Sequence, residues 1–237
     1  MTQRRTNWND LHRTLRDAIA EGRLKPGQSL PTQAELCAKH GLSRHAVRLA
    51  LAALEREGLL ESWQGKGVFV KTARLAYEIG PATRFSSNMQ AAGIAPGLKF
   101  LRAMRRPADA EAARLLALAP GEPLLTAELV RLADEAPVVL ARHSVRASRF
   151  PNFGGDVSET HSITKALARG GVQNFRRANT VIEARLGTQQ EAACLGITPT
   201  QPVLISTGVN VDAEERPVEL SVAISRGDRL AFCLATQ

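Results

Sequence analysis

The sequence predicts an α+β protein of two parts: a small N-terminal part and a larger part that alternates strands with helices. Two patterns support this prediction. Over residues 1–72, apolar residues recur at helical spacing and glycines follow the helical segments. Beyond residue 80, short helical segments alternate with extended stretches bounded by turn residues. We therefore expect one domain at 1–72, a connector at 73–80 and a second domain at 81–237.

The first helix of the N-terminal part is marked by one apolar stripe. Leu11, Leu15, Ala18 and Ile19 follow the helical repeat, and Gly22 ends the segment. A turn rich in glycine and proline follows and separates this helix from the next.

The second and third helices are expected at 32–40 and 43–58. Thr32 and Ser43 are suitable N-caps for them. A short turn that contains Gly41 separates the two helices. A tight glycine-containing turn between two short helices is typical of a helix-turn-helix.

Two short strands are expected after the third helix, near 59–62 and 67–71. The tip between them contains Gly65, Lys66 and Gly67. The glycines let the backbone approach a phosphate closely while the lysine points outward. We expect Lys66 to contact phosphate or the minor groove.

A series of residues in this part matches one known pattern in order and spacing: Pro26-Gly27, Leu30-Pro31, Leu36, Gly41, Ser43-Arg44, Val47-Arg48, Ala50-Leu51, Leu54, Gly58-Leu59, Gly65, Gly67 and Phe69-Val70. The pattern resembles the winged helix-turn-helix of the GntR transcription regulators and covers nearly all of residues 8–71. The resemblance implies a homodimer that binds a palindromic operator in double-stranded DNA. At one position the family usually has an arginine and this chain has Ala34, so its operator preference is expected to differ.

Side chains at the start of the third helix are the candidates for reading DNA, since a recognition helix contacts base edges near its N-terminus. They are Ser43, Arg44, His45 and Arg48. Arg44 and Arg48 are four residues apart and share a face, and arginine suits bidentate contact with guanine. The alternative is a solvated helix face. Thr32 and Gln33 are a further candidate phosphate site, with simple helix capping as the alternative.

The second part is expected to hold several helices and strands. Thr83 and Thr188 are expected to cap two of the helices. The helices are expected at 84–92, 108–118, about 160–169 and 189–195, and the strands at 98–106, 123–133, 137–147, 178–187, 202–211 and 217–226.

Short matches in this part also follow one pattern: Thr83-Arg84-Phe85, residues 118–122, Arg131 to Asp134 with Pro137-Val138, Arg149 to Pro151, Ile182 to Ala184, Leu195-Gly196, Pro217 to Ser221 and Arg226 to Arg229. They resemble the UTRA effector domain of the HutC subfamily of GntR regulators. The resemblance implies a chorismate-lyase-like fold, an antiparallel sheet with helices on one side. Within the subfamily, residues 77–88 and His143 are most similar to PhnF-type regulators of phosphonate metabolism.

The resemblance implies a small-molecule effector, often an anion, and the sequence supports this physically. Arg84 stands at an expected helix start, where free amides favour an anion. Arg131 lies in an otherwise apolar strand, where burying a cation is unfavourable unless an anion or a hydrogen-bond acceptor pairs with it. The candidate effector-binding residues are Arg84, Phe85, Ser86, Arg131, His143, Ser162, Glu219 and Ser221.

Each of these candidates has a structural alternative. Arg131 and Glu219 can form an ion pair with each other, Arg84 can pack on the surface, and His143 can be a strand histidine without a ligand. Leu129 and Ser225 replace an arginine and an aromatic residue found in relatives that bind sugar phosphates. Both differences argue against a hexosamine phosphate as the ligand and leave a smaller anion, such as a phosphonate or a phosphate ester, open.

Charge and motifs narrow the function further. The net charge is +8, and residues 1–72 hold twelve Lys and Arg against seven Asp and Glu, which favours a polyanionic partner. The three cysteines are widely spaced, and no metal-ligand, nucleophile-elbow or P-loop motif is present, so no metal, cofactor or catalytic residue is expected. No signal peptide or membrane span is evident, so we expect a cytoplasmic protein without a membrane partner.

The sequence therefore predicts a transcriptional repressor that a small anionic effector, a phosphonate or phosphate-type metabolite, releases from DNA. The first alternative is a HutC-type repressor that senses a sugar phosphate or a histidine-pathway acid. A second is a chorismate-lyase-like enzyme fused to a DNA-binding module. A third is a basic coat protein that binds nucleic acid without sequence preference.

Overall fold

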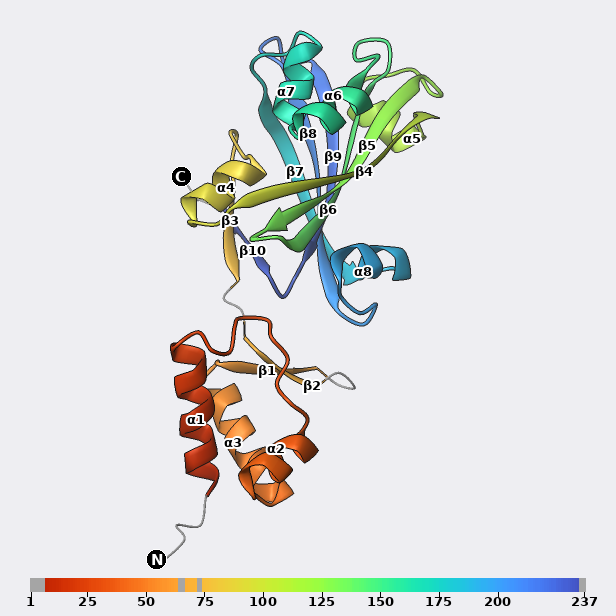
Figure 1. The fold of residues 1–237 in the computed structure, drawn as a ribbon. Coiled ribbons are helices and arrows are strands. Elements are labelled where there is room, and N and C mark those ends of the chain that lie inside the picture. Colours follow the sequence, from red (N-terminus) through yellow and green to blue (C-terminus); the bar gives the residue numbers. More distant parts are fainter. Residues whose placement is uncertain (1–6, 64–66, 72–73, 235–237) are drawn as a thin grey trace, which may run out of the picture. The chain divides into compact units, whose positions relative to one another are not determined.

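The computed structural model describes residues 7–63, 67–71 and 74–234 of the chain. Residue contacts divide it into two units, Met1–Ala73 and Arg74–Gln237 (Figure 1). Each unit has its own apolar core and is described by itself.

The first unit holds three helices and a two-stranded hairpin. Its elements are α1 (Trp8–Ala20), α2 (Gln33–His40), α3 (Arg44–Arg56), β1 (Leu60–Trp63) and β2 (Gly67–Val70). The apolar stripes packed at the centre of this unit include Leu11, Val47 and Leu54, all fully buried. Gly41 ends α2 in the left-handed conformation with φ of 63°, which makes the tight turn into α3. The predicted helix-turn-helix and hairpin are thus present.

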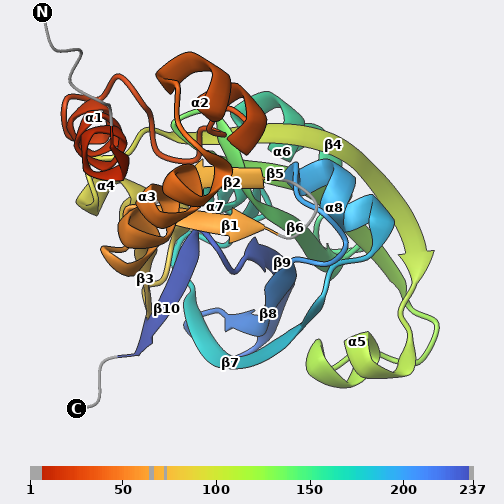
Figure 2. The same ribbon diagram turned by 90° about the horizontal axis from the view of Figure 1, so that it is seen from below.

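The second unit is built on two sheets. Its elements are β3 (Leu75–Ile79), α4 (Phe85–Ala91), β4 (Pro96–Pro107), α5 (Ala110–Leu115), β5 (Pro123–Ala133), β6 (Ala136–Arg146), α6 (Phe153–Thr160), α7 (Ile163–Arg169), β7 (Arg176–Leu186), α8 (Gln189–Leu195), β8 (Pro202–Val211), β9 (Pro217–Arg226) and β10 (Leu230–Leu234). Six strands form an antiparallel sheet in the order β4-β5-β6-β9-β8-β7, and β10 pairs with β3 in parallel. Figure 2 shows the strong curvature of the edge strands β4 and β7.

Helices lie against both faces of the six-stranded sheet (Figure 1). Ala127 and Leu129 on β5 belong to the apolar cluster that also holds residues of α6 and α7. Leu124 and Val130, which point to the opposite face, belong to clusters with α5 and α8. The expected arrangement, with helices on one side, therefore does not hold. No helix in the described part of the chain has the length and apolar composition needed to cross a membrane.

The connector expected at 73–80 is mostly a strand. Leu75–Ile79 pairs with Leu230–Leu234, some 155 residues later in the sequence. Local patterns gave no sign of this pairing because the partner strand is so distant. Thr83 also differs from the expectation: its hydroxyl bonds to Gly80 rather than capping a helix, and Arg84 is the N-cap of α4.

The helix α6 was not expected from the sequence, which placed one helix at about 160–169. Gly154 and Gly155 lower the helix propensity of this segment. The structure explains Gly154: a Cβ there would lie 2.3 Å from the Cβ of Ala103, so only glycine lets α6 approach β4 so closely.

Candidate functional site

The start of α3 presents a polar face. Ser43 caps the helix, and its hydroxyl accepts a hydrogen bond from the amide of Ala46 at 3.2 Å. Arg44, His45 and Arg48 are exposed, while Val47 between them is fully buried. The helix therefore fixes three basic or titratable side chains on the surface at its N-terminal end, where a recognition helix meets base edges.

The other predicted DNA contacts lie at the start of α2 and at the tip between β1 and β2, and the structure describes only some of them. Thr32 and Glu35 form a reciprocal capping box at the start of α2, and Gln33 beside them is exposed. Gly67 is exposed and has φ of 108°, a conformation that favours glycine. Gly65 and Lys66 lie outside the described residues.

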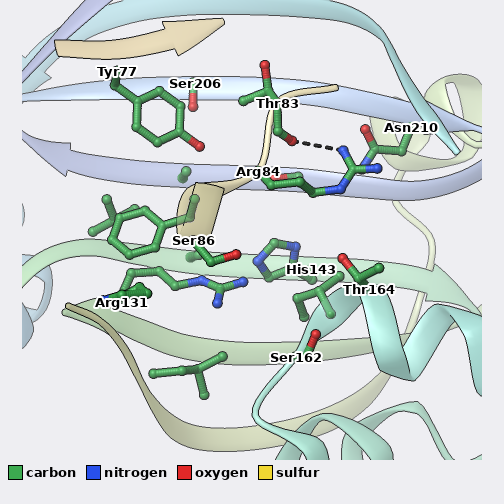
Figure 3. A pocket seen from close by; sticks show the side chains of 18 of the residues that line it. Tyr77, Thr83, Arg84, Ser86, Arg131, His143, Ser162, Thr164, Ser206 and Asn210 are labelled. Carbon is green, nitrogen blue, oxygen red and sulfur yellow. Dashed lines mark hydrogen bonds between the residues drawn. The ribbon is translucent and has the colours of Figure 1, made fainter. Parts of the chain in front are cut away.

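A cavity of about 530 Å³ lies in the second unit. All eight predicted effector residues line it: Arg84, Phe85, Ser86, Arg131, His143, Ser162, Glu219 and Ser221. They come from the start of α4, the start of α7, and the strands β5, β6 and β9. Figure 3 shows five of them: Arg84, Ser86, Arg131, His143 and Ser162. Residues up to 137 positions apart in the sequence thus face one space of a size suited to a small metabolite.

The guanidinium of Arg131 lies at the cavity without a carboxylate in direct contact among the described residues. It is half-buried, and its Cζ lies 5.7 Å from the centre of the Phe85 ring. Within the described ranges, no hydrogen bond or ion pair reaches this guanidinium. Burial lowers the pKa of Arg131, and the nearby Tyr77 and Glu219 oppose that effect. A cation held in this way is a suitable partner for an anionic group.

Glu219 is paired with His143 rather than with Arg131. The carboxylate is 1% exposed and accepts hydrogen bonds from Nδ1 of His143 and Nδ2 of Asn210. Burial alone would raise the pKa of Glu219, but the charge and hydrogen bond of His143, the charge of Arg177 and the Asn210 amide together lower it. The ionised carboxylate only accepts, so Nδ1 of His143 carries a proton.

This pairing leaves two buried polar atoms without a partner among the described residues. They are Nε2 of His143 and Oδ1 of Asn210. Buried polar atoms are nearly always hydrogen-bonded in proteins. A ligand with hydroxyl groups could complete both.

Arg84 is held by backbone oxygens and by an aromatic ring. Its guanidinium donates to the carbonyls of Thr83 and Phe175, each at 2.9 Å, and its Cζ lies 3.8 Å from the centre of the Phe175 ring. Because these partners are neutral, the positive charge stays available to the cavity. The interpretation of Arg84 as a surface-packing residue therefore does not describe its position.

The three serines predicted to bind the effector differ in their hydrogen bonds and in their exposure. Ser162 caps α7, and its hydroxyl accepts a hydrogen bond from the amide of Lys165 at 3.3 Å. Ser86 is exposed, whereas Ser221 is buried opposite His143 in the adjacent strand. Figure 3 shows Ser86 and Ser162 at the cavity together with Arg131 and His143.

Sequence reasoning missed several polar residues that line the cavity, among them Tyr77, Arg177 and Asn210. Tyr77 stood in the expected connector, and Arg177 stood just before the expected strand at 178–187. Asn210 alternates with apolar residues on β8, so its polarity on an inward-facing position was an available signal. Gly208, two residues earlier, was a second signal, because a glycine inside a strand often marks a close approach by another group.

Comparison with known families matches both units. Residues 9–70 match the bacterial regulatory proteins of the gntR family, and residues 91–231 match the UTRA domain. The chain belongs to the GntR family and carries a UTRA domain. An uncharacterised HTH-type transcriptional regulator of Rhizobium meliloti, RB1450, is 33% identical over 97% of this chain and 94% of its own. The transcriptional repressor NagR of Bacillus subtilis is 29% identical over 92% of this chain and 89% of its own.

A solved structure shows the same fold. PhnF from Mycobacterium smegmatis covers 98% of this chain and 99% of its own, with a TM-score of 0.65 and 24% identity. The GntR family and its UTRA domain confirm the fold class and the HutC-type architecture predicted from the sequence. The chain is thus a helix-turn-helix transcription regulator.

Proposed function

We propose that this GntR regulator is a cytoplasmic repressor that binds a palindromic operator as a homodimer and leaves it when a small anion occupies the UTRA cavity. The half-buried guanidinium of Arg131, which has no carboxylate partner in the described part of the chain, is the observation that carries the sensor half of this proposal. An anionic group of a phosphonate or phosphate-type metabolite would supply the missing counter-charge.

The DNA half of the proposal rests on α3. Two copies of the chain set two such helices against operator half-sites about one helical turn apart. Arg44 and Arg48 then contact base edges, and the net excess of basic residues over 1–72 supports phosphate contacts.

Release requires that the effector bind the two states of the protein unequally. The effector shifts the population toward an arrangement in which the two recognition helices no longer fit the operator spacing. The cavity is lined by the strand β3, which directly follows the first unit in the chain. A change at β3 on filling the cavity is therefore a direct route for the coupling.

The polar floor of the cavity favours one alternative effector, a sugar phosphate. Nε2 of His143 and Oδ1 of Asn210 are buried and lack partners among the described residues. Sugar hydroxyls both donate and accept hydrogen bonds and would satisfy both atoms, whereas an alkylphosphonate would leave them unpaired.

A thermal-shift screen with phosphonates, phosphate esters and sugar phosphates tests the proposal. A compound that stabilises the protein is then added to the protein–operator complex. Release of operator by that compound is the expected result. Stabilisation without any change in operator affinity would contradict the repressor mechanism, and no stabilisation by any anion would contradict the sensor.

A further inference from the structure

Two rows of cross-strand neighbours mark opposite ends of the cavity floor. Arg177 on β7 is opposite Asn210 on β8, which is opposite Glu219 on β9. Arg131 on β5 aligns, through one residue of β6, with Ser225 on β9. Glu219 and Ser225 are six residues apart on one strand, which corresponds to roughly 20 Å along the backbone. Arg177, on the edge strand β7, and Arg131, on β5 near the opposite edge, therefore enter the cavity from different ends.

The floor between these rows is lined by short side chains. They are Ser206, Ser221, Ala141 and Ala223. Short side chains leave room for a ligand body to extend from one row toward the other. The two serine hydroxyls, with Nε2 of His143 and Oδ1 of Asn210, offer that body hydrogen bonds.

Arg177 reaches the cavity by crossing β8 at a glycine. A Cβ added to Gly208 would lie 1.7 Å from Nη1 and 2.8 Å from Cζ of Arg177. Any other residue at position 208 would therefore displace the guanidinium. Arg177 lines the cavity, and its guanidinium makes no hydrogen bond or ion pair with any residue that the structure describes.

Arg84 and Arg177 both line the cavity and lie near each other, since the Arg84 guanidinium donates to the carbonyl of Phe175 and the Arg177 amide donates to the carbonyl of Pro81, each at 2.9 Å. Burial lowers the pKa of Arg84, and the charge of Arg177 lowers it further, although Glu219 opposes the effect. Glu219 does not neutralise the pair by contact, because its oxygens bond to His143 and Asn210. Two guanidinium groups without a carboxylate partner suit a phosphate or phosphonate dianion.

Arg131 forms a second cationic end. Figure 3 shows its guanidinium and that of Arg84 entering from different elements, with His143 between them in this view. A single half-buried guanidinium matches the geometry of a carboxylate, which it can hold with two parallel hydrogen bonds.

We propose that the effector is a two-headed anion, with a phosphate or phosphonate held between Arg84 and Arg177, a carboxylate held by Arg131, and a hydroxylated body over the small residues between them. The proposal rests on the proposed function, since it concerns the same cavity. It adds the ligand class and assigns Arg177 as a binding residue and Gly208 as the residue that positions it.

Three matched probes test the proposal on the full-length protein: D-arabinonate 5-phosphate, D-arabinitol 5-phosphate, which lacks the carboxylate, and D-arabinonate, which lacks the phosphate. Titration calorimetry gives each dissociation constant. The wild-type protein should bind the two-headed probe about tenfold or more tightly than either single-headed probe, since each end adds a charge-assisted contact.

Two variants assign the ends. In Arg131→Met, the two-headed probe and the arabinitol phosphate should bind equally, because the carboxylate has lost its partner. In Arg177→Met, the affinity advantage of the two-headed probe over arabinonate should fall about tenfold, because the phosphate keeps Arg84 as its only arginine partner. Gly208→Ala should behave like Arg177→Met, and its unliganded melting temperature checks that it folds. Arg105→Met, on the exposed side of the edge strand β4, is the matched control and should bind as the wild type does.

Equal wild-type affinity for the two-headed probe and arabinitol 5-phosphate overturns the two-headed ligand but leaves anion sensing intact. If Arg131→Met still binds the two-headed probe more tightly than arabinitol 5-phosphate, Arg131 does not hold the carboxylate. Failure of all three probes to bind overturns the proposal, and the wider anion screen then judges the proposed function separately.

Discussion

Replacing Arg44 by alanine separates DNA recognition from stability. The Arg44 side chain is exposed at the start of α3, and no hydrogen bond joins it to another described residue. Its removal should therefore change the free energy of unfolding by less than about 0.5 kcal/mol. Loss of a bidentate base contact should cost roughly 1–3 kcal/mol of operator binding, which raises the dissociation constant about 5- to 150-fold.

The assay uses an operator selected by the wild-type protein from random duplexes. Fluorescence anisotropy at fixed salt then measures binding to that operator and to a panel with single base-pair changes. Arg44→Ala should lose discrimination at one operator position. Arg56→Ala, at the other end of the same helix, is the control and should retain discrimination everywhere. Equal weakening of specific and nonspecific duplexes by Arg44→Ala would refute base recognition by this residue.

The other predictions address the wing, the pocket and its buried carboxylate. Lys66→Ala should weaken all duplexes about equally and reduce the salt slope of binding by about one unit; a base-specific change in the selected operator would contradict a phosphate contact. Arg131→Ala should keep operator affinity and abolish release by the effector, so normal release would remove Arg131 from the pocket. Because the pKa of Glu219 is lowered to about 2, its ionised form contributes stability that is fully present above about pH 4.5 and is lost as pH falls toward about pH 2. Urea unfolding should show Glu219→Gln less stable than wild type near neutral pH, with the difference shrinking through this window; a constant difference would contradict it.

The N-terminal unit was largely predictable because its signals are local. Gly41 sets the turn, Thr32 and Ser43 cap the helices, and the apolar stripe of α3 contains Val47. Each signal lies within a few residues of the feature it specifies. Helix ends were placed within two residues for α2 and α3 for the same reason.

The second unit was less predictable because its pairings are distant. Leu75–Ile79 needs a partner strand near the other end of the chain, and no local pattern shows that partner. The helix α6 was not predicted because two glycines lower the helix propensity of its segment. Gly154 is needed there because α6 packs closely against β4.

The candidate pocket shows the same division. Charged residues in apolar strands, such as Arg131 and Glu219, were visible in the sequence, and the structure places both at the cavity. The structure does not form the ion pair between them that was the structural alternative: Glu219 pairs with His143 and Asn210 instead. Which of several inward-facing polar groups contact each other depends on strand order, because β9 lies between β6 and β8.

Reciprocal linkage between the two ligands is the most direct test of the account. The dissociation constant of the anion identified by the screen is measured for the free protein and for the protein saturated with operator duplex. The operator constant is then measured with and without saturating anion. Each ligand should weaken the binding of the other by the same factor, about 5- to 150-fold. An anion that binds the free and operator-bound protein with equal affinity would contradict it.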